Sequence, residues 1–154
     1  MFQVPAIRLP LIRSLIAACA ALFLALSPFA NAADAPAKPN AKHRVIFQVS
    51  DNDPGKWNLA LNNARNVQQD LGERNVEIEI VAYGPGIGML KLDSPVGNRV
   101  AEAMATGVQV VACENTMRNQ KLSKDDMLTK IDYVGAGVVE LMIKQQQGWA
   151  YIRP

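Results

Sequence analysis

The chain has 154 residues, 49% of them hydrophobic and 19% charged, with two cysteines and one histidine. Its formal net charge of +2 gives no electrostatic indication of a nucleic acid or an anionic membrane surface as partner. So few histidines and cysteines cannot form a closed metal site without help from acidic residues, and we assign no metal.

The first 32 residues have the pattern of a signal peptide. Arg8 and Arg13 supply a positive start, an apolar run follows over 14–26, and Ala30-Asn31-Ala32 offers the small residues that a signal peptidase needs. We therefore expect cleavage after Ala32 and a periplasmic protein. The apolar run, about 13 residues long, is shorter than the roughly 20 residues that span a bilayer, and an uncleaved anchor is the main alternative.

Removal of this segment changes both the charge and the cysteine count. Without Arg8 and Arg13, 14 basic residues face 14 acidic ones, so the mature chain is close to neutral and keeps no stable membrane anchor. About 120 residues remain, enough for one domain with a sizeable core. Cys19 leaves with the signal, and its lipidation is a weaker alternative. Cys113 is then the only thiol.

Residues 33–43 are polar and contain prolines, which predicts a disordered leader, and we expect the folded domain over 44–154. Apolar or alternating runs predict strands at 44–49, 76–83, 108–112, 133–134 and 149–152. Helical spacing of apolar residues, with capping residues and terminal glycines, predicts helices at 56–71, 95–105, 124–130 and 138–147. The sequence of the segment 89–92 favours neither a strand nor a helix.

Strands and helices alternate, and the connections between them are short. This order predicts a parallel sheet with helices on both faces, a three-layer α/β/α sandwich. In such a sheet the loops after the strands share one edge, where ligands usually bind. The loops at this edge are 50–55, 84–88, 113–117 and 135–137.

Cys113 ends the third predicted strand and is therefore expected at this ligand-binding edge. A thiol there is a candidate for reversible sulfur chemistry, whereas a buried, inert cysteine is the alternative. His43 precedes the first strand and belongs at the opposite edge, about 17–20 Å away, so it cannot pair with the thiol. We expect backbone N–H groups of the turn at 114–119 to stabilise the thiolate, with Arg118 and Lys121 as candidate positive charges.

The neighbouring loops hold further candidate binding groups. Asp51 lies in the polar loop after the first strand, and Gly84, Gly86 and Gly88 form either a tight turn or a backbone nest for a small anion. The glycine-rich loop lacks the Gly-Lys-Ser/Thr ending of a phosphate loop, and no dinucleotide fingerprint follows the first strand. The only histidine fits no Ser-His-Asp triad. We assign no cofactor.

Five regions of the chain, in order, carry a resemblance to a known family. They are VSDND at 49–53 with Trp57 and LNNARN at 61–66, VAYGPG at 81–86, GVQVVACENTM at 107–117, GAGVVEL at 135–141, and QQGWAYIRP at 146–154. With these motifs the chain resembles the DsrE/DsrF-like sulfur-relay family, and specifically its small exported branch.

The resemblance implies a five-stranded parallel sheet between helices and assembly into homo-oligomers. It also implies that a cysteine after the third strand accepts sulfane sulfur as a persulfide. Cys113 matches that cysteine, and Arg118 matches a basic residue that follows it. The glycine that often follows this arginine is absent, because Asn119 and Gln120 stand there. Export separates the protein from cytoplasmic relay partners, so transfer to a tRNA-modifying enzyme is not expected.

The leading hypothesis is a periplasmic sulfur carrier with Cys113 as catalytic residue, oriented by loop amides, Asn115 and Thr116, and exchanging sulfur with a donor or acceptor protein. Whether it is an enzyme stays open, since a carrier or transferase is the most this chemistry requires. One alternative is a non-enzymatic oligomeric module that binds a small anion or a partner and has a structural cysteine. Another is a redox sensor joined through Cys113. The leading hypothesis assumes a thiol open to solvent.

Overall fold

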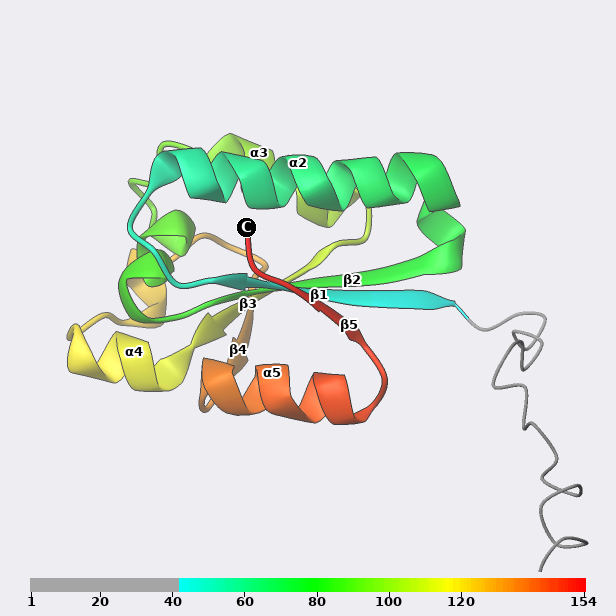
Figure 1. The fold of residues 1–154 in the computed structure, drawn as a ribbon. Helices are drawn as coiled ribbons and strands as arrows, with labels where there is room; N and C mark the ends of the chain where they lie inside the picture. Colours follow the sequence, from blue (N-terminus) through cyan, green and yellow to red (C-terminus); the bar gives the residue numbers. More distant parts are fainter. Residues whose placement is uncertain (1–41) are drawn as a thin grey trace, which may run out of the picture. The chain divides into compact units, whose positions relative to one another are not determined.

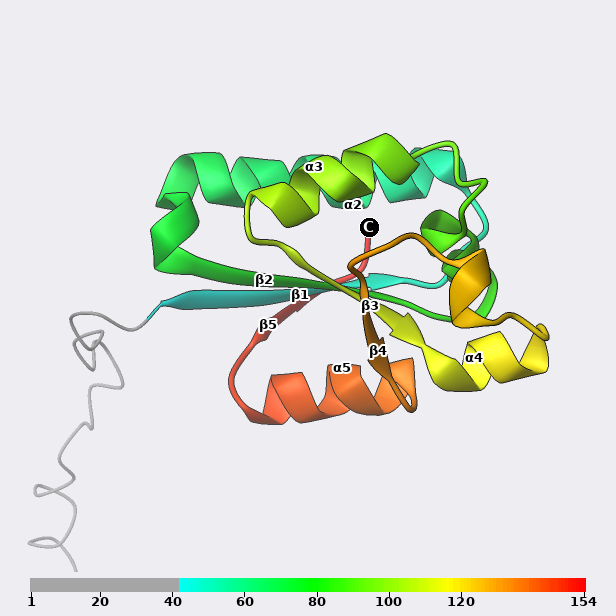
Figure 2. The same cartoon turned by 180° about the vertical axis from the view of Figure 1, so that it is seen from behind.

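The structure, a computed structural model, describes residues 42–154, so the predicted signal peptide and most of the predicted leader lie outside the described residues. A five-stranded sheet has the order β4-β3-β2-β1-β5, and all its strand pairs are parallel. Figures 1 and 2 show α2 and α3 on one face of this sheet and α4 and α5 on the other. The predicted three-layer α/β/α sandwich is confirmed.

The elements follow the predicted order. The strands are β1 His43–Val49, β2 Val76–Ala82, β3 Gln109–Cys113, β4 Asp132–Val134 and β5 Ala150–Ile152. The α-helices are α2 Pro54–Leu71, α3 Gly97–Ala105, α4 Glu114–Asn119 and α5 Gly137–Gln146. Three 3-10 turns complete the domain: η1 Glu73–Asn75, η2 Gly84–Leu90 and η3 Lys124–Asp126. β1 already includes His43, the last residue of the predicted leader.

Two segments differ from the sequence-based expectation. The helix predicted at 124–130 is wrong: only η3 is helical there, closed by Asp126, whose carboxylate accepts from the Ser123 N–H at 2.7 Å. The chain then extends, because Met127 is buried in the core and pairs with Lys91 in an isolated bridge. The residues expected as a turn at 114–119 form the helix α4.

The glycine-rich segment is a 3-10 turn rather than an open loop. η2 also includes the first half of the unassigned segment 89–92, where Met89 and Leu90 are fully buried. Gly86 makes this approach possible, because a Cβ at this position would lie 2.3 Å from the Val49 carbonyl oxygen. η2 is therefore pressed against the end of β1.

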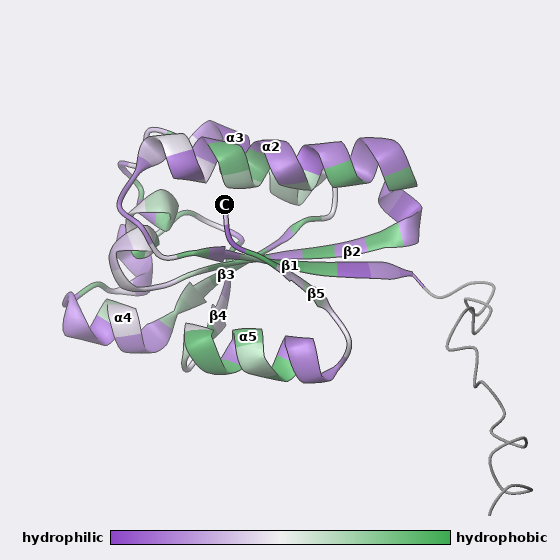
Figure 3. Cartoon of the chain, viewed as in Figure 1, coloured by the Kyte–Doolittle hydropathy of each residue, from purple (hydrophilic) through white to green (hydrophobic). Residues whose placement is uncertain are grey.

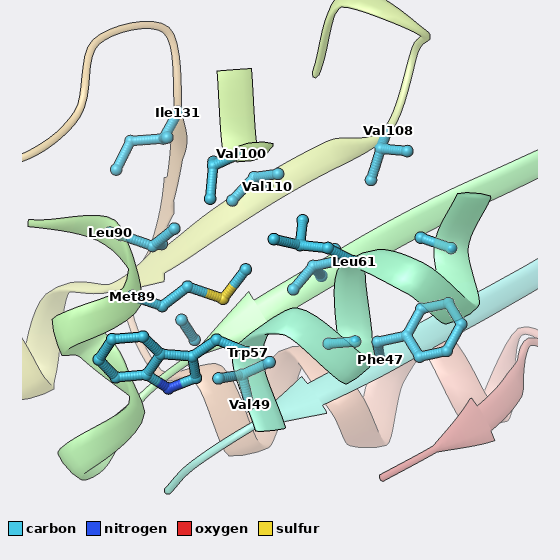
Figure 4. Close-up of a cluster of buried hydrophobic side chains, with 14 of the residues drawn as sticks. Phe47, Val49, Trp57, Leu61, Met89, Leu90, Val100, Val108, Val110 and Ile131 are labelled. Carbon is cyan, nitrogen blue, oxygen red and sulfur yellow. The ribbon is translucent and has the colours of Figure 1, made fainter. Parts of the chain in front are cut away.

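Most of the core lies between the sheet and α2/α3. The Asp53 carboxylate accepts from the Gly55 N–H at 2.8 Å and caps α2, and Gly72, with φ of 85°, ends it. The apolar stripe of α2 includes Trp57 and Leu61, which face the strands. Figure 4 shows this cluster, whose labelled members are Phe47, Val49, Trp57, Leu61, Met89, Leu90, Val100, Val108, Val110 and Ile131.

The opposite layer, beneath α5, has a much smaller core. Its buried members are Ile46, Val81, Val111, Leu141 and Trp149. Only Leu141 among these belongs to α5 itself. The two helical layers are therefore attached to the sheet with unequal amounts of apolar contact.

Gly86→Ala should destabilise the domain by about 1–3 kcal/mol, since η2 must move away from the Val49 carbonyl to admit a methyl group. Urea unfolding measures this loss. Gly135→Ala is the matched control: a Cβ there meets nothing within 4 Å, and its stability should stay within about 0.5 kcal/mol of wild type. Equal stability of the two variants would contradict the packing role of Gly86.

Candidate functional site

Cys113 is the last residue of β3 and directly precedes α4. Its side chain lies on the α5 face of the sheet, as does that of Val111 two residues earlier. In the parallel sheet His43 starts β1 opposite Val76, the start of β2. Cys113 and His43 thus lie at opposite ends of the parallel strands, as predicted.

The first turns of two helices converge on the sulfur of Cys113. The Thr116 hydroxyl and the backbone N–H groups of Asn115 and Thr116 approach it from α4, and the Gly137 N–H approaches it from α5. The Asn115 N–H is shared, since it also donates to the Gly135 carbonyl at 3.1 Å. N–H groups in the first turn of a helix have no partner within the helix and favour negative charge. The thiolate thus receives the donors that two helix starts leave free.

These donors change the acidity of the thiol. Burial raises the pKa of Cys113 and is the largest single influence, but the hydrogen bonds from Thr116, Gly137 and Asn115 together outweigh it, so the pKa is lowered from its ordinary value. A lowered pKa increases the fraction of thiolate, which is the nucleophile. The side-chain hydroxyl of Thr116 makes the largest of the lowering contributions.

The expectation that the thiol is open to solvent is wrong, because Cys113 is only 4% exposed. The starts of α4 and α5, which supply the donors, also cover the sulfur. A surface pocket of about 410 Å³ adjoins it, and two of its lining residues, Asn115 and Val134, are direct neighbours of Cys113. The other lining residues are Gly135, Ala136, Val139 and Glu140. The sulfur is therefore buried among polar donors next to a pocket that it does not line.

Thr116 connects the thiol with the glycine-rich segment. Its hydroxyl oxygen accepts from the Gly84 N–H at 2.9 Å, which leaves the hydroxyl proton for the sulfur. Gly84 has a φ of 54° and its carbonyl accepts from Gln120 at 3.2 Å. Gly86 and Gly88 instead lie in tight packing contacts, Gly88 against the Trp57 ring. Of the three glycines, the structure joins Gly84 to the thiol site.

The other predicted site residues fall into two groups. The side-chain oxygen Oδ1 of Asn115 accepts a hydrogen bond from the Arg118 guanidinium, and both side chains are exposed on α4. Asp51 lies in a separate cluster, 3.1 Å from Lys56 and 3.3 Å from Arg153. Its hydrogen bond from Lys56, opposed by desolvation and joined by Arg153, lowers the pKa of Asp51.

Sequence reasoning missed the contribution of Gly137. The loop 135–137 was placed at the correct edge, but nothing in its composition indicates that an N–H reaches the sulfur. A Cβ at Gly137 would lie 3.0 Å from that of Tyr83 and 3.1 Å from Val81. The absence of a side chain therefore allows the start of α5 to come down onto the sheet beside Cys113.

Within residues 42–154, histidine, cysteine and acidic side chains form no group of three that is arranged to hold a metal ion. None of the helices described in that range is long and apolar enough to cross a membrane.

Thr116→Val should slow alkylation of Cys113 at neutral pH by roughly fivefold, the factor expected from the loss of one hydrogen bond of about 1 kcal/mol. The reason is the loss of the hydroxyl that stabilises the thiolate. The pH dependence of the iodoacetamide rate measures this effect. Thr116→Ser, which keeps the hydroxyl, is the control, and an unchanged pH profile in Thr116→Val would show that the hydroxyl does not tune the thiol.

Comparisons with known proteins agree with this fold. A model of the DsrE/DsrF-like family matches residues 43–154. A protein of unknown function from Methanobacterium thermoautotrophicum, MTH1491, is 39% identical with a TM-score of 0.70, over 73% of this chain and 100% of that one. A conserved protein of unknown function from Bacteroides thetaiotaomicron, BT1422, shares the fold at 14% identity and a TM-score of 0.60, over 72% of this chain and 94% of that one.

No curated protein shows significant similarity to the chain. The family match covers nearly all the residues that the structure describes, including β3, the thiol and the donors around it. The five motifs, at 49–66, 81–86, 107–117, 135–141 and 146–154, all lie within the matched range. The chain therefore belongs to the DsrE/DsrF-like family.

Proposed function

We propose that this protein carries sulfane sulfur as a persulfide on Cys113. The convergence of hydrogen-bond donors from α4 and α5 on the Cys113 sulfur carries the proposal, because such an environment favours a nucleophilic thiolate. Membership of the DsrE/DsrF-like family supports sulfur relay as the setting. A merely structural cysteine needs no such set of donors.

The proposed reaction transfers one sulfur atom from a donor to Cys113, without net oxidation of the two taken together. The Cys113 thiolate attacks the outer sulfur of a donor persulfide, a new S–S bond forms, and the donor leaves as a thiolate. With thiosulfate the leaving group is sulfite. An acceptor thiolate then attacks the outer sulfur of the Cys113 persulfide and releases Cys113 as the thiolate.

The residues around the sulfur have separate parts in this proposal. Thr116, fixed by the Gly84 N–H, and the Gly137 N–H stabilise the charge on the inner sulfur. Arg118 is exposed and hydrogen-bonded to the side chain of Asn115, which lines the adjoining pocket, so we propose that it supplies a positive charge near this pocket. That charge suits an anionic donor such as thiosulfate or a persulfide.

We place this reaction in the periplasm. This part of the proposal rests on the signal-peptide pattern of residues 1–32. In that compartment sulfur passes to or from another exported protein or a small sulfur anion, and the cytoplasmic relay proteins are not available as partners.

Incubation of the reduced protein with polysulfide should add the mass of one sulfur atom to the peptide that contains Cys113, and dithiothreitol should remove it. Peptide mass spectrometry checks this, and it separates Cys113 from Cys19. Cys113→Ser should show no such adduct on this peptide. If Cys113 of the wild type alkylates normally but takes up no sulfur, the carrier proposal is wrong.

The exposed surface of α5 favours a second candidate, an oligomeric binding module. Val138 is 61% exposed and Met142 51%, and Figure 3 shows hydrophobic residues along α5. The charged side chains of this helix, Glu140 and Lys144, are instead paired close to the sheet. A face without free charges can meet its own copy without repulsion, so we propose that α5 joins subunits. The burial of Cys113 also disfavours a redox sensor that links subunits by a disulfide.

Met142→Glu should lower the oligomeric mass measured by light scattering after size exclusion, since it places a charge in the proposed interface. Leu59→Glu is the control, because Leu59 is 45% exposed on α2, across the sheet from α5. Cys113→Ser should leave the mass unchanged. A protein that stays monomeric, or whose mass Met142→Glu does not alter, would rule out the α5 interface.

A further inference from the structure

α5 covers the thiol but has little apolar attachment to the sheet. Leu141 is its only buried hydrophobic side chain, and Val138, Val139, Met142 and Ile143 are all exposed. An element with few buried apolar contacts opens at a lower free energy than the rest of a domain. A further interaction is therefore needed to hold α5 in place.

A buried ion pair provides that interaction. Glu79 on β2 is 2% exposed, and its carboxylate lies 2.5 Å from the Lys144 ammonium group of α5. The same ammonium group is 3.6 Å from Glu140 and 4.3 Å from the centre of the Trp149 ring. The charged groups that face Glu79 thus come from α5.

Glu79 is an unusual residue for the middle of a buried strand. Burial raises the pKa of Glu79, and the hydrogen bond from Lys144 opposes this rise. Its second carboxylate oxygen, Oε1, is buried and has no hydrogen-bond partner among the described residues. A leucine at this position would fill the layer without that penalty. The carboxylate thus holds Lys144, and with it α5, at a definite place over the sheet.

The same helix carries the groups that reach the thiol. The N–H of Gly137, its first residue, approaches the Cys113 sulfur and helps to lower the pKa of the thiol. Gly137 lies about 10 Å along the helix axis from Lys144, at 1.5 Å per residue. Segments with few buried apolar contacts open as cooperative units, and α5 has only ten residues. Loss of the contact at Lys144 therefore lowers the free energy of opening of the whole helix, Gly137 included. Access to Cys113 is therefore coupled, through α5, to the ion pair between Lys144 and Glu79.

We propose that Glu79 and Lys144 are positioning residues that hold α5 over Cys113, and that opening of their ion pair gives sulfur donors access to the thiol. The importance of this access rests on the proposed sulfur transfer, but the coupling itself does not. The pair touches neither the sulfur nor the pocket beside it. It acts through the position of the Gly137 N–H.

The test measures how fast the Cys113 thiolate reacts with iodoacetamide on the alkaline plateau, where the rate no longer depends on its pKa. Glu79→Gln and Lys144→Met each break the pair from one side, and each should raise this plateau rate about tenfold or more, the factor that corresponds to 1.4 kcal/mol of lost local stability. Lys144→Arg keeps the charge and should restore a rate close to that of the wild type. The pH profile of each variant separates a change of access from a change of pKa.

Two matched controls separate local opening from general loss of stability. Glu77 lies on β2, as Glu79 does, and forms an exposed ion pair with Lys42 at 3.8 Å. Glu77→Gln breaks this pair and should leave the plateau rate of alkylation unchanged. Val100→Ala, in the opposite layer, lowers global stability without touching α5 and should also leave it unchanged. Urea unfolding places the variants on one stability scale.

An unchanged plateau rate in Glu79→Gln and Lys144→Met would overturn the proposal. So would a Val100→Ala rate that rises as much at equal loss of global stability, because opening would then be global. Alkylation needs no sulfur donor. A protein that opens as predicted but takes up no polysulfide sulfur would therefore refute the carrier function alone.

Discussion

The site depends on one interaction, the convergence of the first turns of α4 and α5 on the sulfur of Cys113. β3 ends at the cysteine and α4 begins with the next residue, so the α4 donors follow directly from the chain. The Gly137 N–H arrives from another part of the sequence. Burial without these donors would desolvate the thiol and leave its anion unstabilised, and the pKa of Cys113 would rise.

Burial and reactivity are opposed at this position, and the arrangement reconciles them. A sulfur that is 4% exposed is protected from unspecific oxidation, which follows thiolate character and exposure. The polar donors lower the free energy of the thiolate although the sulfur is buried from solvent. The proposed opening of α5 would then control when a sulfur donor reaches Cys113, as a carrier that holds sulfur between partners requires.

The layers and the place of the thiol followed from local patterns. Alternation of strands and helices predicts parallel strands, and parallel strands place the end of β3 at the ligand edge. The burial of Cys113 was not predictable, because it depends on how α5 sits on the sheet. The position of α5 on the sheet depends on the close approach that Gly137 permits and on the ion pair of Glu79 with Lys144. Both bring together residues that are far apart in the chain. Likewise, the helix predicted at 124–130 does not continue past Asp126, because the Met127 side chain is buried in the core.

The converging donors lower the pKa of the buried Cys113 thiol. The most direct measurement is the pH dependence of its alkylation in the folded wild-type protein, with the unfolded protein as reference. We expect an apparent pKa for Cys113 below that of the same thiol in the unfolded chain. An apparent pKa equal to or above that reference would mean that burial outweighs the converging donors and that Cys113 is not an activated thiol.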